Sequence, residues 1–261
     1  MYSAPKIAMK YLKYWFKSRN QYYLHSPFVY KLISEVIYDK KVYPVYDSIE
    51  KIRIKLKNSK EKVNMLDYGA KAKSDKDVRS IKSIVKSSAK SKKLASCLHR
   101  LVHHFQPKYM LEFGSSLGIS TMYQALGNKD SMFTSMEGSP EVATIAKANL
   151  SSIKCDQVSL EVGNFDHILD EQLRKFPQLD YVFFDGNHQE KPTIEYFEAC
   201  LAKAHNETLF IFDDIHWSEG MEKAWDYIKS HEKVTVTIDL FFVGLVFFRK
   251  EQAKQDFIIR Y

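Results

Sequence analysis

Two short apolar stretches of the chain end in acidic residues, and one of them has a histidine close by. The segment YVFFDGNH places Asp185 after an apolar run and His188 three residues later, and the segment LFIFDD places Asp213 and Asp214 after a second run. Carboxyl ends of neighbouring parallel strands meet at one edge of a sheet, so we expect the three carboxylates to converge. Three close anions repel one another unless a cation lies between them, and oxygen ligands favour a hard ion such as Mg²⁺.

A glycine-containing loop follows a third apolar run, in the segment YMLEFGSSLGIS. Glu112 ends the run, Gly114 permits a tight turn, and Gly118 opens an amphipathic segment whose first N–H groups can face a carboxylate or phosphate. About 20 residues later the next run ends in Glu137 and Gly138. An acid at that place is suited to accept hydrogen bonds from ribose hydroxyls, so the two segments together predict a nucleotide-like cofactor site.

A similar stretch, NMLDYG, occurs earlier in the chain and includes Asp67, Tyr68 and Gly69. Lysines, a serine and two aspartates follow it, with no apolar helix start and no second run that ends in an acid. We therefore interpret it as a strand or turn of an accessory region rather than as a nucleotide site.

The elements that must position these residues alternate regularly after Tyr109. We expect five strands, at 109–114, 131–137, 158–163, 180–185 and 208–213, each followed by a helix, at 119–127, 140–152, 166–176, 191–204 and 218–231. The run from Val234 to Arg249 is strand-like throughout and leaves no room for a crossover helix, which predicts an antiparallel pair. The predicted fold is α/β, a doubly wound, mostly parallel seven-stranded sheet with a terminal antiparallel hairpin.

The N-terminal part of the chain has a different character. Helices are expected at 8–16, 28–37, 46–56 and 94–105, and the Ser/Lys-rich stretch 70–93 reads as a mobile surface segment or lid. Residues 1–108 carry 25 Lys+Arg against 8 Asp+Glu, whereas residues 109–261 carry 14 against 24. We predict a basic, mainly helical accessory or cap region over residues 1–93 and a Rossmann-like cofactor-binding domain over residues 94–261.

Composition excludes several classes of protein. At 45% hydrophobic residues the chain is not disordered, and its apolar runs are too short for a membrane span. Without a signal-peptide pattern we expect a cytoplasmic protein. The three cysteines, Cys97, Cys155 and Cys200, are odd in number and widely spaced, which indicates buried thiols rather than disulfides or a zinc site. The basic half could meet nucleic acid, an anionic membrane surface or the acidic half of its own chain.

Residues 109–250 resemble the class I S-adenosylmethionine-dependent methyltransferases, and among them the small-molecule O-methyltransferases of the catechol and caffeoyl-CoA type. The segments LEFGSSLGIS, MEGSP and EVGNFD are similar to the family's first three motifs. The segment HSPFVY, followed by this domain, makes the whole chain resemble a group of bacterial methyltransferase-like proteins. The resemblance implies S-adenosylmethionine as cofactor. Its methionine end would lie on the first motif, its ribose on the second and its adenine on the third, which implies as binding residues Glu112, Gly114, Ser115, Gly118, Ser120, Glu137, Gly138, Asn164, Phe165 and Asp185.

The same resemblance implies a metal site and a catalytic pair. Asp185 and the pair Asp213 and Asp214 would hold Mg²⁺ or another divalent cation, and His188 stands where the catechol enzymes carry a catalytic lysine. With Asp185 beside it, His188 would remove the proton of a hydroxyl on a small-molecule acceptor, and the oxyanion would attack the sulfonium methyl in line. His188 could instead be a surface loop residue, and Asp185 a structural or cofactor-side acid.

Three other functions remain open from the sequence. An NAD-dependent oxidoreductase would use Glu137 equally well, although the spacing of Gly114 and Gly118 differs from the dehydrogenase pattern. The basic N-terminal region leaves an RNA or other nucleic-acid methyltransferase or binding protein as an alternative. A protein that keeps the cofactor but has lost turnover is the third. A homodimer is compatible with all of them, and the methyl acceptor is not identified by any motif.

Overall fold

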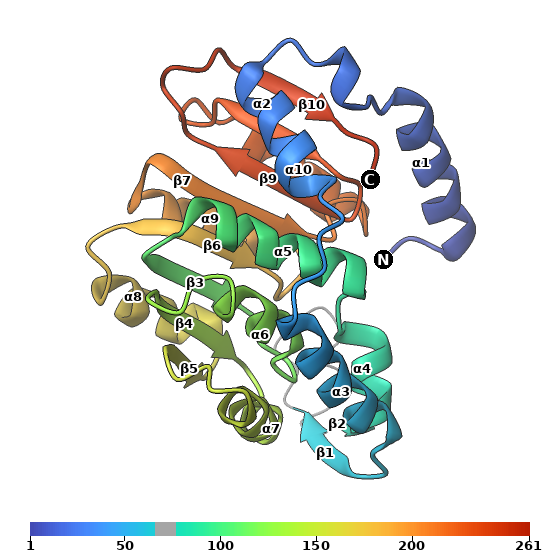
Figure 1. Ribbon diagram of the computed structural model, residues 1–261, viewed down its shortest axis with the longest axis vertical. Coiled ribbons are helices and arrows are strands. Elements are labelled where there is room, and N and C mark those ends of the chain that lie inside the picture. Colours follow the sequence, from blue (N-terminus) through green and yellow to red (C-terminus); the bar gives the residue numbers. More distant parts are fainter. Residues whose placement is uncertain (66–76) are drawn as a thin grey trace. The chain divides into compact units, whose positions relative to one another are not determined.

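The computed structural model describes residues 1–65 and 77–261, which form two compact units (Figure 1). One unit consists of Met1–Glu35 with Leu173–Tyr261, and the other of Val36–Gln172. The predicted division at residue 93 stays a prediction. The motif Asp67-Tyr68-Gly69 and the first part of the predicted lid lie outside the described residues, whereas residues 77–93 form a strand, a helix and the start of a second helix.

Three parallel strands form the sheet of the unit Val36–Gln172. Their order is β3 (Tyr109–Phe113), β4 (Met132–Glu137) and β5 (Val158–Val162). β3 is almost wholly buried, as expected for a parallel strand covered on both faces. The connecting helices are α6 (Ile119–Ala125) and α7 (Pro140–Ser152), and α8 (Phe165–Arg174) follows β5.

The rest of this unit comes from the N-terminal half of the chain. Its elements are α3 (Val45–Asn58), the antiparallel pair β1 (Lys62–Met65) and β2 (Asp77–Ser80), α4 (Ile81–Ser88) and α5 (Lys92–Phe105). Ser91 caps α5 by accepting the N–H of Leu94 at 3.2 Å. The buried Arg100 guanidinium on α5 donates to the carbonyls of Val36 and Ile37, which satisfies a charge that burial would otherwise destabilise.

The other unit contains a mixed sheet in the order β10-β8-β9-β7-β6. The strands are β6 (Leu179–Phe184), β7 (Ala204–Asp213), β8 (Val236–Asp239), β9 (Val243–Phe247) and β10 (Gln255–Ile258). β6 and β7 are parallel, β9 is antiparallel to both β7 and β8, and β10 is parallel to β8. Gly244 is required in β9 because a Cβ there would lie 2.5 Å from the Trp225 ring.

Helices complete this unit. They are α9 (Glu190–Leu201) and α10 (Glu219–Ser230), together with α1 (Ala4–Lys17), η1 (Gln21–Tyr23) and α2 (Pro27–Leu32), which continues into η2 (Ile33–Ile37). Ser26 caps α2 by accepting the N–H of Val29. The predicted α/β fold with its mostly parallel sheet and antiparallel pair is confirmed. The short edge strand β10 was not predicted, since residues 255–258 carry no apolar alternation that marks them.

Two smaller expectations can also be compared with the structure. All three cysteines are free and buried, as predicted. Among the described residues, none of the helices combines the length and apolar character needed to cross a bilayer.

Candidate active site

The loop between β3 and α6 has the backbone that its glycines predict. Gly114 and Gly118 have φ values of 88° and 80°, and Ser116 between them has 47°, all in the left-handed region. The N–H groups of Gly114 and Ser115 both donate to the carbonyl of Met136, at 2.9 and 3.2 Å. The loop is thus fastened to the end of β4, the strand that carries the second motif.

Glu112 lies under this loop and is completely buried. Four side chains donate to its carboxylate. Thr121 Oγ1 and Ser135 Oγ bond to Oε2, at 2.6 and 2.5 Å, and Gln124 Nε2 and Ser120 Oγ bond to Oε1, at 2.6 and 3.3 Å. Burial raises the pKa of this carboxyl, and the four hydrogen bonds oppose that shift. Glu112 therefore bonds to side chains of the protein itself and stabilises the shape of the loop.

Gly118 and Ser115 of the loop have different surroundings. A Cβ at Gly118 would meet the backbone and side chain of Ala146 at 3.4 Å, so this glycine allows α7 to approach the loop. The hydroxyl of Ser115 is buried and has no hydrogen-bond partner among the described residues. An unpartnered buried hydroxyl beside positive-φ backbone is a feature that a bound ligand would satisfy.

Glu137 ends β4 with its carboxylate fixed from two sides. Oε2 accepts the N–H of Ser116 at 2.8 Å, and Oε1 accepts the N–H of Ser139 at 3.0 Å. The side chain is 9% exposed, and Gly138 beside it is half-buried.

Asn164 and Phe165 follow β5 at the start of α8. Asn164 Oδ1 accepts the N–H of Asp166 at 3.1 Å, and its carbonyl accepts the N–H groups of His167 and Ile168. The Phe165 ring stands edge-on to Phe113 at the end of β3, with centroids 5.7 Å apart. The third motif therefore lies close to the first within this unit.

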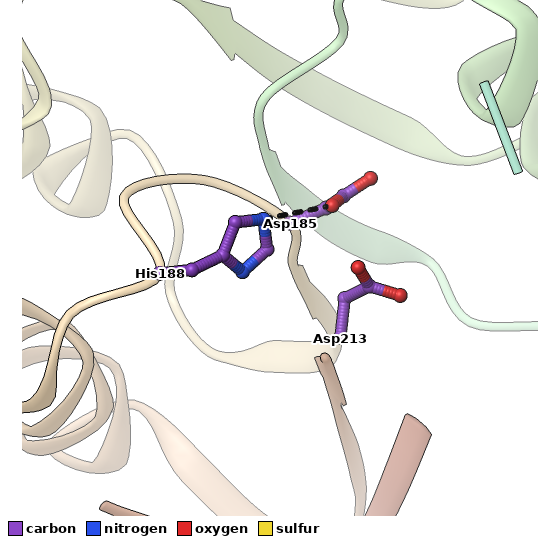
Figure 2. Close-up of side chains that lie close together, drawn as sticks. All are labelled: Asp185, His188 and Asp213. Atoms are coloured by element: carbon purple, nitrogen blue, oxygen red, sulfur yellow. Dashed lines mark ion pairs between the residues drawn. The ribbon is translucent and has the colours of Figure 1, made fainter. Parts of the chain in front are cut away.

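The other unit brings Asp185, His188 and Asp213 together. Phe184 pairs with Phe212 in the β6–β7 ladder, so the two aspartates that follow these residues lie side by side. One ligand atom from each of the three side chains lies within 4.8 Å of the others. His188 Nε2 is 3.6 Å from Asp185 Oδ1, and Figure 2 shows the imidazole turned toward that carboxylate with Asp213 rising from the end of its strand.

The loop that carries His188 is shaped by a residue that the sequence reasoning did not single out. Asn187 has a φ of 53°, and its side chain donates to Tyr196 Oη at 3.3 Å and accepts from Gln189 Nε2 at 2.7 Å. Asparagine tolerates the left-handed region better than most residues, so the turn DGNH is locally specified.

Asp214 is not part of this three-residue group. Its φ is 54°, and its N–H donates to the carbonyl of Phe242 at 2.7 Å. It lines a small, partly open cavity together with a mainly apolar and aromatic set, namely Ile7, His216, Trp217, Phe241 and Phe242. His216 bonds to Glu222 at 3.1 Å and to Asp239 at 2.8 Å.

A family model described as a methyltransferase domain matches residues 111–215. Residues 111–215 are therefore similar to a methyltransferase domain. The match begins in β3 and ends after β7, so it includes all three motifs together with Asp185, His188 and Asp213. No curated protein sequence matches the chain significantly.

Solved structures with the same fold include several methyltransferases. A putative O-methyltransferase from Klebsiella pneumoniae has a TM-score of 0.57 at 19% identity, with 80% of this chain and 92% of that chain covered. An O-methyltransferase from Bacillus cereus in complex with SAH has 0.56 at 17%, covering 83% and 96%. An SAH-bound methyltransferase from Podospora anserina has 0.59 at 12%, covering 87% and 98%. The predicted methyltransferase is confirmed in domain and fold, and neither the oxidoreductase nor the nucleic-acid alternative is favoured.

Proposed function

We propose that the protein transfers the methyl group of S-adenosylmethionine to an oxygen of a small-molecule acceptor. The observation that carries the proposal is the group formed by Asp185, His188 and Asp213 at the ends of two adjacent strands of the methyltransferase domain. The structural neighbours described as O-methyltransferases, one of them in complex with SAH, support it.

The cofactor would bind to the unit Val36–Gln172. We assign its methionine end to the loop of Gly114, Ser115 and Gly118, where the unpartnered Ser115 hydroxyl fits a polar group of the ligand. Glu137 and Gly138 would hold the ribose, with the Glu137 carboxylate accepting from its hydroxyls. Asn164 and Phe165 would line the adenine. Glu112 and Ser120 would act indirectly, by holding the loop in shape, and the bound cofactor would supply an electrophilic methyl on a good leaving group.

The donor set of the other unit fits a divalent cation. Asp185 and Asp213 offer carboxylate oxygens, and one ligand atom of each lies within 4.8 Å of the other. These residues would hold Mg²⁺ or a similar ion, which when bound would lower the pKa of an acceptor hydroxyl. Asp214 would contribute only by way of the adjoining cavity.

The residues of the chain then have distinct roles in the reaction. His188 takes the hydroxyl proton of the acceptor on a ring nitrogen, and the neighbouring Asp185 carboxylate stabilises the imidazolium that results. The acceptor oxygen forms a new bond to the methyl carbon while the carbon–sulfur bond breaks, and both electrons of that bond stay on sulfur. Beyond deprotonation, the protein contributes positioning.

The acceptor would enter the cavity beside Asp214. Trp217, Phe241 and Phe242 offer apolar ring faces there, which suit a planar aromatic molecule. A phenolic acceptor that carries vicinal hydroxyls matches the apolar walls with its ring, and its hydroxyls match the polar side chains of Asp185, His188 and Asp213.

Transfer of tritiated methyl from S-adenosylmethionine to 3,4-dihydroxybenzoate, with Mg²⁺ present, tests the proposal. We expect labelled product from the native protein and a decrease of roughly 10²- to 10⁴-fold in kcat for His188→Gln, the usual contribution of a general base. The affinity for S-adenosylhomocysteine should stay unchanged in that variant. Label transfer that is equal in the two proteins would show that His188 is not the base.

A further inference from the structure

The first helix of the chain, α1, has two apolar faces, and only one of them is packed against the protein. On the packed side Tyr14 is 5% exposed and its hydroxyl donates to the carbonyl of Ile259, while the Tyr11 ring stands edge-on to Phe241 at 5.0 Å. Lys10 reaches Glu222 at 2.8 Å on the same side. These contacts fix the orientation of α1 within its unit.

The opposite face of α1 presents large apolar side chains to solvent. Met9, Leu12 and Phe16 are spaced i, i+3 and i+7, so they share one face of the helix, with exposed fractions of 55%, 55% and 79%. Trp15, at 40% exposed, lies at the edge of this face. We call these four residues the α1 stripe. A contiguous exposed patch of large apolar side chains indicates an interaction site.

A row of cations borders the α1 stripe. Lys6, Lys13 and Lys17 are exposed and are spaced i, i+7 and i+11. Because an α-helix turns by about 100° per residue, these three lysines lie on one side of α1, next to Met9 and Phe16. On the other edge, the Arg260 guanidinium stacks over the Trp15 ring at 4.3 Å. The chain contains no acidic residue before Glu35. Residues 1–34 therefore contribute apolar side chains and positive charge, without a carboxylate, to this surface.

We propose that the α1 stripe and its lysine row bind peripherally to an anionic lipid bilayer surface, with α1 lying in the plane of the membrane. A helix with Trp, Phe and Leu on one side and lysines beside them is the pattern of interfacial helices, in which apolar side chains enter the acyl boundary and cations meet lipid phosphates. In Figure 1, α1 (blue) lies at the margin of its unit.

Two other occupants fit the charges and side chains less well. In a two-fold dimer the same patch meets itself, so the lysine rows of two copies would come together with no carboxylate from residues 1–34 to pair with them. A nucleic-acid backbone would bind the lysines but would leave Met9, Leu12 and Phe16 without an apolar partner. The proposal does not depend on the methyl acceptor or on the metal group.

Vesicle co-sedimentation of the full chain tests the proposal. The native protein should sediment with vesicles of phosphatidylglycerol and phosphatidylcholine, bind pure phosphatidylcholine weakly, and be released by salt. Lys13→Gln with Lys17→Gln should lower partitioning roughly 25-fold, since each lysine near an anionic surface contributes about fivefold. Leu12→Ser with Phe16→Ser should lower it roughly 100-fold, since each buried apolar side chain contributes about tenfold or more.

The matched control is Ile54→Ser with Lys57→Gln on α3, where Ile54 is 58% exposed, much as Leu12 is. It should sediment like the native protein, and all variants should keep the native melting temperature, because every changed side chain is exposed. Vesicle addition should also shift the fluorescence of Trp15 to shorter wavelength, a signal lost in Trp15→Phe. Failure of the native protein to sediment, or equal loss in the control, would overturn the proposal. So would a dimer in light scattering that the α1 variants dissociate in the absence of lipid.

Discussion

Replacing Glu137 by alanine tests how the methyltransferase domain would hold the ribose of its cofactor. In the folded protein the carboxylate already accepts two backbone N–H groups, from Ser116 at 2.8 Å and from Ser139 at 3.0 Å. The substitution therefore removes two charge-assisted bonds within the protein as well as any bond to a ribose. Hydrogen bonds to charged groups contribute about 1.5–3 kcal/mol each, so we expect a loss of roughly 2–4 kcal/mol in the free energy of unfolding after water replaces part of them.

The effect on ligand binding is separate from this loss of stability. Two ribose hydroxyls on one carboxylate are worth roughly 2–4 kcal/mol together, and at 1.4 kcal/mol per factor of ten this predicts a 30- to 700-fold weaker Kd for S-adenosylhomocysteine. Isothermal titration calorimetry at a temperature where the variant stays folded measures this value. The exposed acid Asp156 of the same unit provides the control Asp156→Ala, which should bind like the native protein. An unchanged Kd in folded Glu137→Ala would refute the ribose assignment.

Three further predictions concern burial and the acidic group. Glu112→Gln should cost less than about 1.5 kcal/mol because the amide can exchange donors with the surrounding hydroxyls, whereas Glu112→Ala should cost about 3–5 kcal/mol by leaving buried donors unpaired; denaturant unfolding measures both. Burial, with His103 and Arg100 adding to it, lowers the pKa of His99 from 6.5 to about 4, so its contribution to stability is present above pH 6.5 and is lost, by roughly 3 kcal/mol, as the pH falls toward 4; His99→Gln should flatten that part of the stability curve. Asp213→Asn should raise the Mg²⁺ concentration needed for half-maximal activity by at least roughly 10- to 100-fold, the loss seen when residues outside the ligand shell are changed. Native activity that EDTA does not alter would contradict a metal role.

The sequence was informative wherever an apolar run ended in a chemically distinctive residue. Asp185 and Asp213 lie together because hydrophobic strands of parallel register deliver them to one edge, and that register follows from burial alone. The glycines of the β3–α6 loop could likewise be predicted, because no other residue tolerates their backbone as well. The order of helices and strands after Tyr109 followed from the same periodicity.

The parts that the sequence did not reveal depend on long-range contacts. The sequence around Glu112 does not show that Gln124 and Ser135 donate hydrogen bonds to it. These bonds form only when the loop, α6 and β4 pack together. Nor does the sequence show that the missing Cβ of Gly118 faces Ala146. The cavity at Asp214 includes Ile7 from the opposite end of the chain, a contact that no local pattern encodes.

The most direct test of the central claim is a pair of calorimetric titrations of the native protein, one with S-adenosylhomocysteine and one with NADH. The methyltransferase domain and its second motif predict one S-adenosylhomocysteine bound per chain and no measurable heat from NADH. Binding of NADH in the absence of any binding of S-adenosylhomocysteine would contradict the proposed function.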